Sequence, residues 1–186
     1  LVATVNPKKV SATTLAEFVK QAKAAPGAMN YSSAGSGSPS HVAAELLKEK
    51  VGINLVHIPY KGSALSVNDL LGGQVEFTIE TENLVAQHIK AGTLRGLAIM
   101  SKARSAIIPE VPSIVEEGYP GLVVEAWQGV VVPARTPQAV IDKLDRTLKD
   151  ILGRKDIQSR LMERGIFPAY EGSASFGDFM KTERAR

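Results

Sequence analysis

Up to residue 100, the hydrophobic positions alternate between the two-residue period of strands and the 3.6-residue period of amphipathic helices. The pattern predicts strands over 1–5, 29–34, 54–58, 75–79 and 94–100, with one helix between each consecutive pair. Strands that alternate with helices at this spacing predict an α/β fold, in which helices flank a parallel-rich sheet through right-handed crossovers.

The first two helices carry clear apolar faces. Thr14 and Glu17 form a capping-box pattern at the start of the first, and Gly52 follows the second as a stop signal. The residues expected to face the sheet are Leu15, Phe18, Val19 and Ala22 in the first helix and Val42, Ala43, Leu46 and Leu47 in the second.

Beyond residue 100 the pattern changes. After a Pro/Gly-rich passage, the apolar run 123–132 predicts a long strand that holds the only tryptophan, Trp127. An amphipathic helix is expected after Pro137, a second helix is expected to end at Gly165, and a third begins around Phe176. These helices have few strands to pack on, so we expect them to pack on a segment that precedes Leu1.

Composition narrows the class of protein. With 44% hydrophobic residues among 186, the chain can bury a core, and no apolar stretch approaches the length that crosses a bilayer. The 22 basic and 19 acidic residues form no basic run interleaved with aromatics, so no nucleic-acid partner is expected. The absence of cysteine excludes disulfides and thiolate metal sites. Because the chain opens on Leu1 inside a strand, we interpret it as a fragment whose signal peptide has been lost.

The segment 33–41 is the strongest candidate for ligand binding. Gly35 and Gly37 let backbone N–H groups approach a ligand, and Ser38 and Pro39 are suited to begin the next helix. The positive end of that helix would face a carboxylate or a phosphate. An ordinary strand-to-helix connection fits the same residues, which lack the Gly-Lys-Ser/Thr of a P-loop and the third glycine of a dinucleotide fingerprint.

Two further loops lie at strand ends, where ligands of layered α/β sheets collect. Tyr60 and Lys61 offer a hydroxyl and an ammonium group, although a lysine in a turn is commonly only solvated. Glu80 would repel a carboxylate, and Thr81 is better explained as a helix cap. Trp127 fits either a core position or the wall of a cleft.

Enzymatic and metal chemistry find less support. Ser38, His41 and Asp69 would allow an esterase-like triad, but the Gly-x-Ser-x-Gly elbow is absent. The three histidines, His41, His57 and His88, show no i, i+4 pairing, so no metal site is expected. No cofactor is expected either.

Several runs in register resemble the tripartite tricarboxylate transporter receptors, the Bug-type periplasmic solute-binding proteins. They are NYSSAGSGS at 30–38, VHIPYKGSA at 56–64, DLLGGQVE at 69–76, HIKAG at 88–92 and PEVPS at 109–113. The resemblance covers nearly the whole chain in a constant order and spacing. It implies a non-catalytic receptor rather than an enzyme.

This resemblance implies a type II periplasmic-binding-protein fold, in which two lobes joined by crossing strands clamp a ligand. Residues 1–6 and 123–132 would be the crossing strands, 7–122 the second ligand-binding lobe, and 133–186 the C-terminal part of an incomplete first lobe. The chain would be cut at both ends, and we expect this fragment alone to bind ligand weakly or not at all.

The resemblance also implies which residues bind the ligand. The ligand-binding residues would be Ser33, Gly35, Ser36, Gly37, Ser38, His41, Tyr60, Lys61, Gly62, Glu80, Thr81 and Trp127. Family members usually have Asp-Asn where this chain has Glu80-Thr81. The longer carboxylate and the lost amide change the side of the pocket that sets ligand identity.

The expected protein is a periplasmic receptor, monomeric at full length, that carries a small carboxylate-bearing solute to membrane permease subunits. The alternative is the ligand-sensing effector domain of a transcription regulator. The full-length N-terminus separates the two, because a signal peptide supports the receptor and a helix-turn-helix supports the regulator.

Overall fold

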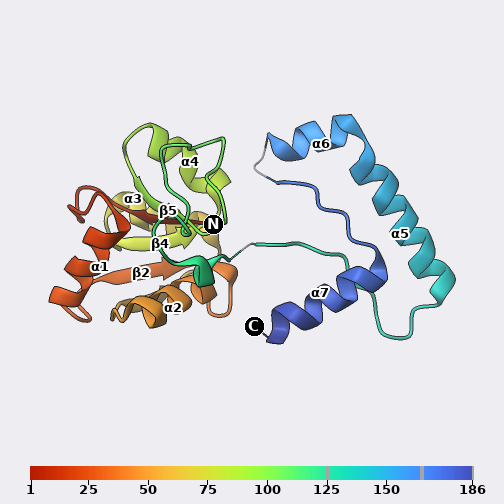
Figure 1. The fold of residues 1–186 in the computed structure, drawn as a ribbon, viewed down its shortest axis with the longest axis horizontal. Coiled ribbons are helices and arrows are strands. Elements are labelled where there is room, and N and C mark those ends of the chain that lie inside the picture. The colour runs from red at the N-terminus through yellow and green to blue at the C-terminus, as the bar shows by residue number, and fades with distance from the viewer. Residues whose placement is uncertain (125, 164–165, 186) are drawn as a thin grey trace. The chain divides into compact units, whose positions relative to one another are not determined.

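The structure is a computed structural model that describes residues 1–124, 126–163 and 166–185. The chain divides into two compact units, Leu1–Trp127 and Gln128–Arg186 (Figure 1). Within the described residues, no helix is both long enough and apolar enough to cross a membrane.

One mixed sheet forms the centre of the first unit. In the described part of the chain its strands are β1 (Val2–Val5), β2 (Asn30–Ser33), β3 (Val56–Pro59), β4 (Phe77–Glu80) and β5 (Arg95–Ile99), in the order β3-β2-β4-β1-β5. β2 is parallel to β3 and β4, which confirms the parallel-rich α/β prediction. β1 is the exception, because it runs antiparallel to both β4 and β5.

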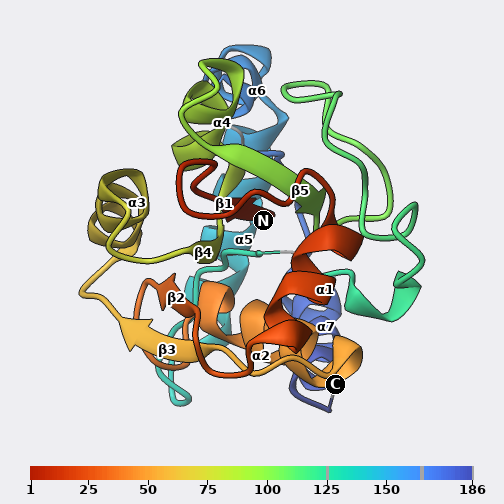
Figure 2. The same cartoon turned by 90° about the vertical axis from the view of Figure 1, so that its left-hand side faces the viewer.

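Helices cover both faces of this sheet (Figure 2). α1 (Leu15–Ala24) and α2 (Pro39–Val51) pack on one face, and α3 (Ser63–Gly72) and α4 (Glu82–Lys90) pack on the other. The predicted capping box forms at the start of α1, where the Glu17 N–H donates to Thr14 Oγ1 at 3.2 Å. The alternation of strands and helices therefore gives a three-layer unit.

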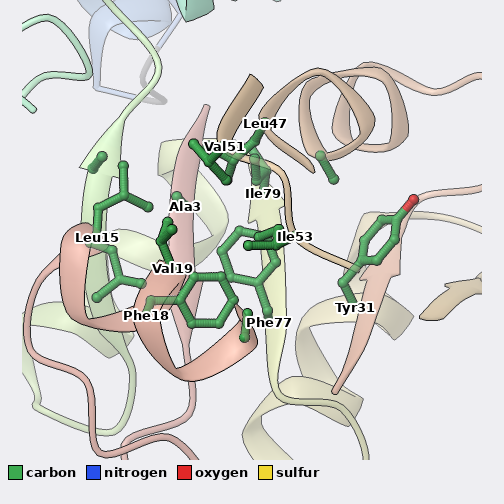
Figure 3. Packing of buried hydrophobic residues seen from close by; sticks show 14 of the residues in the cluster. Ala3, Leu15, Phe18, Val19, Tyr31, Leu47, Val51, Ile53, Phe77 and Ile79 are labelled. Atoms are coloured by element: carbon green, nitrogen blue, oxygen red, sulfur yellow. The ribbon is translucent and has the colours of Figure 1, made fainter. Parts of the chain in front are cut away.

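The core beneath α1 agrees with the sequence pattern. Leu15, Phe18, Val19 and Ala22 are all buried, as predicted. Phe18 stacks on Phe77 of β4, with ring centroids 4.6 Å apart (Figure 3).

The expected inward face of α2 is partly wrong. Val42 and Leu46 are 44% and 38% exposed, whereas Ala43 and Leu47 are fully buried. Two neighbouring i, i+4 stripes run along this helix, and the one that includes the small Ala43 lies against the sheet.

The predicted strand over 123–132 is also wrong for the described residues. Val123 and Val124 and the residues from 126 to 132 belong to no strand; Glu125 lies outside the described residues. A strand needs a neighbouring strand with which to exchange hydrogen bonds. At the start of this segment the Val124 N–H donates to Met100 O at 2.9 Å, but no strand pairing includes its described residues. The boundary between the two units falls inside this segment.

The second unit contains the three expected helices, α5 (Gln138–Gly153), α6 (Lys155–Met162) and α7 (Ser173–Ala185). The expected end of the second helix at Gly165 lies outside the described residues. None of the described residues of this unit is buried.

Candidate functional site

Three predicted loops meet at one edge of the sheet. Because β2, β3 and β4 are parallel neighbours, their carboxyl ends, Ser33, Pro59 and Glu80, lie at the same edge. Backbone hydrogen bonds join two of the loops, from the Tyr60 N–H to Ser33 O at 3.0 Å and from the Gly62 N–H to Ala34 O at 3.1 Å. The strand-and-helix order thus brings the predicted residues from 33 to 41, 60 to 62 and 80 to 81 to one edge.

Gly35 is required where two of these loops touch. Its φ of +131° is one that side chains rarely adopt, and a Cβ atom there would lie 3.2 Å from Tyr60 O. Glycine therefore lets the 33–41 loop lie directly against the loop after β3.

The 33–41 loop uses most of its own hydrogen-bond donors internally. The Ala34 N–H donates to Ser40 Oγ at 2.9 Å, the Gly35 N–H to Ser33 Oγ at 3.2 Å, and the Gly37 N–H to His41 Nδ1 at 3.1 Å. Ser38 caps α2 as expected, because its Oγ accepts from the His41 N–H at 3.3 Å. Ligand contact by Gly35 and Gly37 stays a prediction, since their N–H groups already have partners.

Open donors lie beside this loop. Among the hydrogen bonds of the described residues, the N–H groups of Ser36, Lys61 and Ser63 have no acceptor. Gly62 caps α3 without a side chain, and Thr81 takes the N-cap position of α4 without a side-chain cap bond. The first N–H groups of a helix carry partial positive charge, so this edge suits an anion.

Tyr60 and Lys61 differ in how they are held. The Tyr60 hydroxyl donates to Asp69 Oδ2 at 2.6 Å, and burial together with this carboxylate raises the pKa of Tyr60 to about 12. Lys61 is exposed, as a solvated lysine would be. Tyr60 therefore offers its ring or its oxygen lone pairs to a ligand more readily than its proton.

Glu80 and Trp127 lie in opposite environments. Glu80 is 1% exposed at the end of β4, whereas Trp127 is 45% exposed at the end of the first unit. A place for Trp127 beside the three loops stays a prediction.

Sequence reasoning missed His57. Its ring stacks between those of Tyr31 and His41, at centroid distances of 4.8 and 4.2 Å, and its Nε2 lies 2.7 Å from Ser33 Oγ. Burial and the neighbouring His41 lower the pKa of His57. The register that pairs Tyr31 with His57 could have indicated the stack, because cross-strand partners point to the same face.

The esterase-like triad does not form among the described residues. Asp69 accepts from Tyr60, His41 Nδ1 accepts from the Gly37 N–H, and the Ser38 hydroxyl donates to Gly35 O at 2.6 Å. No base is therefore placed to take a proton from Ser38.

A hollow of the first unit lies away from these loops. It encloses about 250 Å³ near the start of β5, at the opposite edge of the sheet. Its one arginine, Arg95, already donates to Ala12 O at 2.9 Å. The strand ends after β2, β3 and β4 remain the better candidate, because they present open donors.

Comparison with known proteins decides the family. The profile of the tripartite tricarboxylate transporter family receptor matches residues 1–186. The chain belongs to this receptor family. It is 38% identical to protein BugT of Bordetella pertussis over 168 residues, which are 90% of this chain and 51% of BugT. The chain spans about half the length of the curated relatives it matches.

Two solved structures from Rhodopseudomonas palustris share the fold. Rpa4515 of R. palustris, solved with adipate, superposes with a TM-score of 0.88 at 29% identity, over 100% of this chain and 62% of that one. MatC of Rhodopseudomonas palustris, with bound malate, gives 0.81 at 25% identity, over 89% and 56%. The predicted periplasmic-binding-protein class of fold is confirmed, and these matches give no support to a transcription regulator.

Proposed function

We propose that this chain is the ligand-binding part of a periplasmic receptor that captures a small carboxylate-bearing solute for the permease of a tripartite tricarboxylate-type transporter. The observation that carries the proposal is the group of open N–H donors around Ser36, Lys61 and Ser63, at the strand ends where α3 begins. Such donors bind anions. Adipate and malate in the related structures favour a carboxylate over a phosphate.

Closure of a second lobe over this edge is part of the proposal. The Met100 N–H donates to Leu1 O, and the Val124 N–H donates to Met100 O, both at 2.9 Å. The segments 1–6 and 123–132 therefore start beside Met100, next to the end of β4, where crossing segments would have to leave the lobe 7–122. Residues 133–186 would belong to the other lobe, and hinge closure would trap the ligand. A signal peptide and a monomeric full-length receptor complete the proposal.

Isothermal calorimetry on the full-length protein tests this function. We expect malate or adipate to bind and hexane-1,6-diol, which lacks the carboxylates, to give no heat of binding. Binding of the diol as tightly as adipate, or no binding of any small di- or tricarboxylate, would contradict the proposal. The chain 1–186 alone should bind at least about tenfold more weakly, because the proposed clamp would lack one wall.

A matched pair of variants locates the site. Ser36→Glu places a carboxylate beside the open donors, and Asn68→Glu adds the same charge on the exposed side of α3. We expect Ser36→Glu to weaken carboxylate binding at least about tenfold, because like charges a few ångströms apart repel strongly. Asn68→Glu should leave binding unchanged; equal losses in both variants would place the ligand elsewhere.

A further inference from the structure

The Glu80 carboxyl group is buried with too few hydrogen-bond donors. It points from β4 toward the α3 side of the sheet and is 1% exposed. Its Oε1 has no partner among the described residues, and its Oε2 accepts from the Thr81 N–H at a long 3.4 Å. A carboxylate has two oxygens that each accept more than one hydrogen bond, so this environment is poor for the ionised form.

The neighbouring serines do not repair this shortage. Each hydroxyl has a single proton, and Ser66 donates its proton to Ser32 Oγ at 2.8 Å. Ser38 donates to Gly35 O, so the proton in its 3.0 Å contact with Ser40 comes from Ser40. The protons of Ser40 and Ser66 thus each have another acceptor, so either hydroxyl can stabilise a Glu80 carboxylate only by giving up that bond, whereas a neutral acid can donate to their lone pairs.

No cation in the described part of the structure compensates for a charge on Glu80. Burial raises the pKa of Glu80, and hydrogen bonds from Ser63 and the Thr81 N–H, followed by Ser40 and Ser66, oppose the rise without reversing it. The nearer titratable or charged groups on the elements around it are bound elsewhere or are acidic: Tyr31 on β2, His41, Glu45 and Lys48 on α2, Asp69 on α3 and Glu82 on α4. Glu49 and Lys50 of α2 and His88 and Lys90 of α4 lie near the far ends of their helices. β1 has no titratable side chain.

We propose that Glu80 is a positioning residue that sets the charge of this site: as a neutral acid it donates to the serine hydroxyls and leaves the edge open to an anionic ligand, and as a carboxylate it repels that ligand. The inference rests on the proposed carboxylate-binding function. Because linkage is reciprocal, binding of a carboxylate should in turn draw a proton onto Glu80.

The first test needs no ligand. Carbon-13 NMR of the glutamate carboxyl groups in the chain 1–186, with Glu80→Gln used to assign the signal, gives the titration midpoint of Glu80. We expect a midpoint above the ordinary value of 4.5. A midpoint at or below that value overturns the inference even if the full-length receptor binds carboxylates.

The second test is the pH profile of binding in the full-length protein, with malate and adipate as probes. We expect wild type to weaken at least about tenfold relative to Glu80→Gln as the pH rises through the midpoint. Both proteins see the same ionisation of the probe, so the ratio isolates Glu80. Glu49→Gln, which removes an exposed carboxylate from α2, should follow wild type.

The outcomes separate the two proposals. A constant ratio of wild type to Glu80→Gln, with binding intact, overturns the role of Glu80 and leaves the receptor function standing. Failure of wild type to bind either probe or any other small carboxylate at every pH overturns both. Proton uptake on binding, measured in buffers of different ionisation enthalpy, should be smaller in Glu80→Gln, and equal uptake counts against the inference.

Discussion

The first and second units use the same kind of amphipathic helix with opposite results. In the first unit, the apolar face of α1 is fully buried, because a sheet lies beneath it. In the second unit, α5 carries an equally clear apolar face, yet Val140, Leu144 and Ile151 are 46%, 39% and 39% exposed. The period of a pattern shows which face of a helix is apolar. It does not show what covers that face.

The largest expected difference between the units is independent folding. A protein ending at Trp127 should unfold cooperatively, because its buried clusters are formed by residues of the first unit. Residues 128–186 alone should show only partial, non-cooperative helix, since isolated helices of this length are marginal in water. Circular dichroism melts of both pieces check this. A cooperative thermal transition of residues 128–186 alone would contradict the prediction that only the first unit folds independently.

Truncation of one apolar side chain in each unit compares how much burial stabilises the two units. Phe18→Ala removes a fully buried ring that stacks on Phe77 and should cost about 3–5 kcal/mol in the free energy of unfolding. Leu144→Ala removes a half-exposed side chain of α5 and should change it by less than about 0.5 kcal/mol. Urea denaturation of the chain 1–186 measures both values, and similar losses would show that α5 is buried in solution.

Two glycines extend the comparison to tight packing. A Cβ atom on Gly96 of β5 would lie 2.8 Å from a methyl group of Val111, so Gly96→Ala should destabilise the first unit by about 1–3 kcal/mol. Gly177 lies in the interior of α7 with open space around it. Gly177→Ala should raise the helix content of the second unit, because alanine favours a helix over glycine by up to about 1 kcal/mol. Urea titration measures the first effect and circular dichroism the second. A stabilising Gly96→Ala, or a loss of helix content in Gly177→Ala, would contradict this prediction.

The smallest expected difference is a pH dependence confined to the first unit. The pKa of His57 is lowered below 6.5 in the folded state, so the unfolded chain takes up the proton first as the pH falls. The free energy of unfolding should therefore decrease below about pH 6.5, by at most about 1.4 kcal/mol per pH unit.

The free energy of unfolding of wild type minus that of His57→Gln, taken at each pH, isolates the contribution of His57 from that of Glu80. The raised pKa of Glu80 acts in the other direction, because its stabilising neutral form is lost as the pH rises above 4.5. The second unit has no histidine, so its helix content should not respond in this range. A wild-type minus variant difference that stays flat between pH 7.5 and pH 5 would contradict the prediction.

Much of the first unit could be predicted from local patterns. The stripe of Leu15, Phe18, Val19 and Ala22 has one interpretation, because the positions between them are polar or small. On α2 two apolar stripes compete, and only the presence of the sheet decides that Ala43 faces inward and Val42 outward. The strand expected over 123–132 failed for a similar reason, since an apolar run does not supply its own hydrogen-bonding neighbour.

The candidate site could be predicted in position but not in detail. The order of strands and helices was enough to bring Ser33, Tyr60 and Glu80 to one edge. Which donors remain open depends on side-chain contacts between distant segments. The stack of His57 between Tyr31 and His41 and the pair of Tyr60 and Asp69 are contacts of this kind.

The antiparallel position of β1 also has a consequence for folding. Val2 pairs with Glu80 on one side and with Ile99 on the other, so the first strand of this chain waits for the last two strands of the sheet. Contacts between segments so distant in sequence slow folding, because the chain must close a long loop before they form. During synthesis β1 has no partner until β4 is complete, and it lacks its second partner until β5 is complete. A chain that must remain unfolded while it is exported would be helped by this delay.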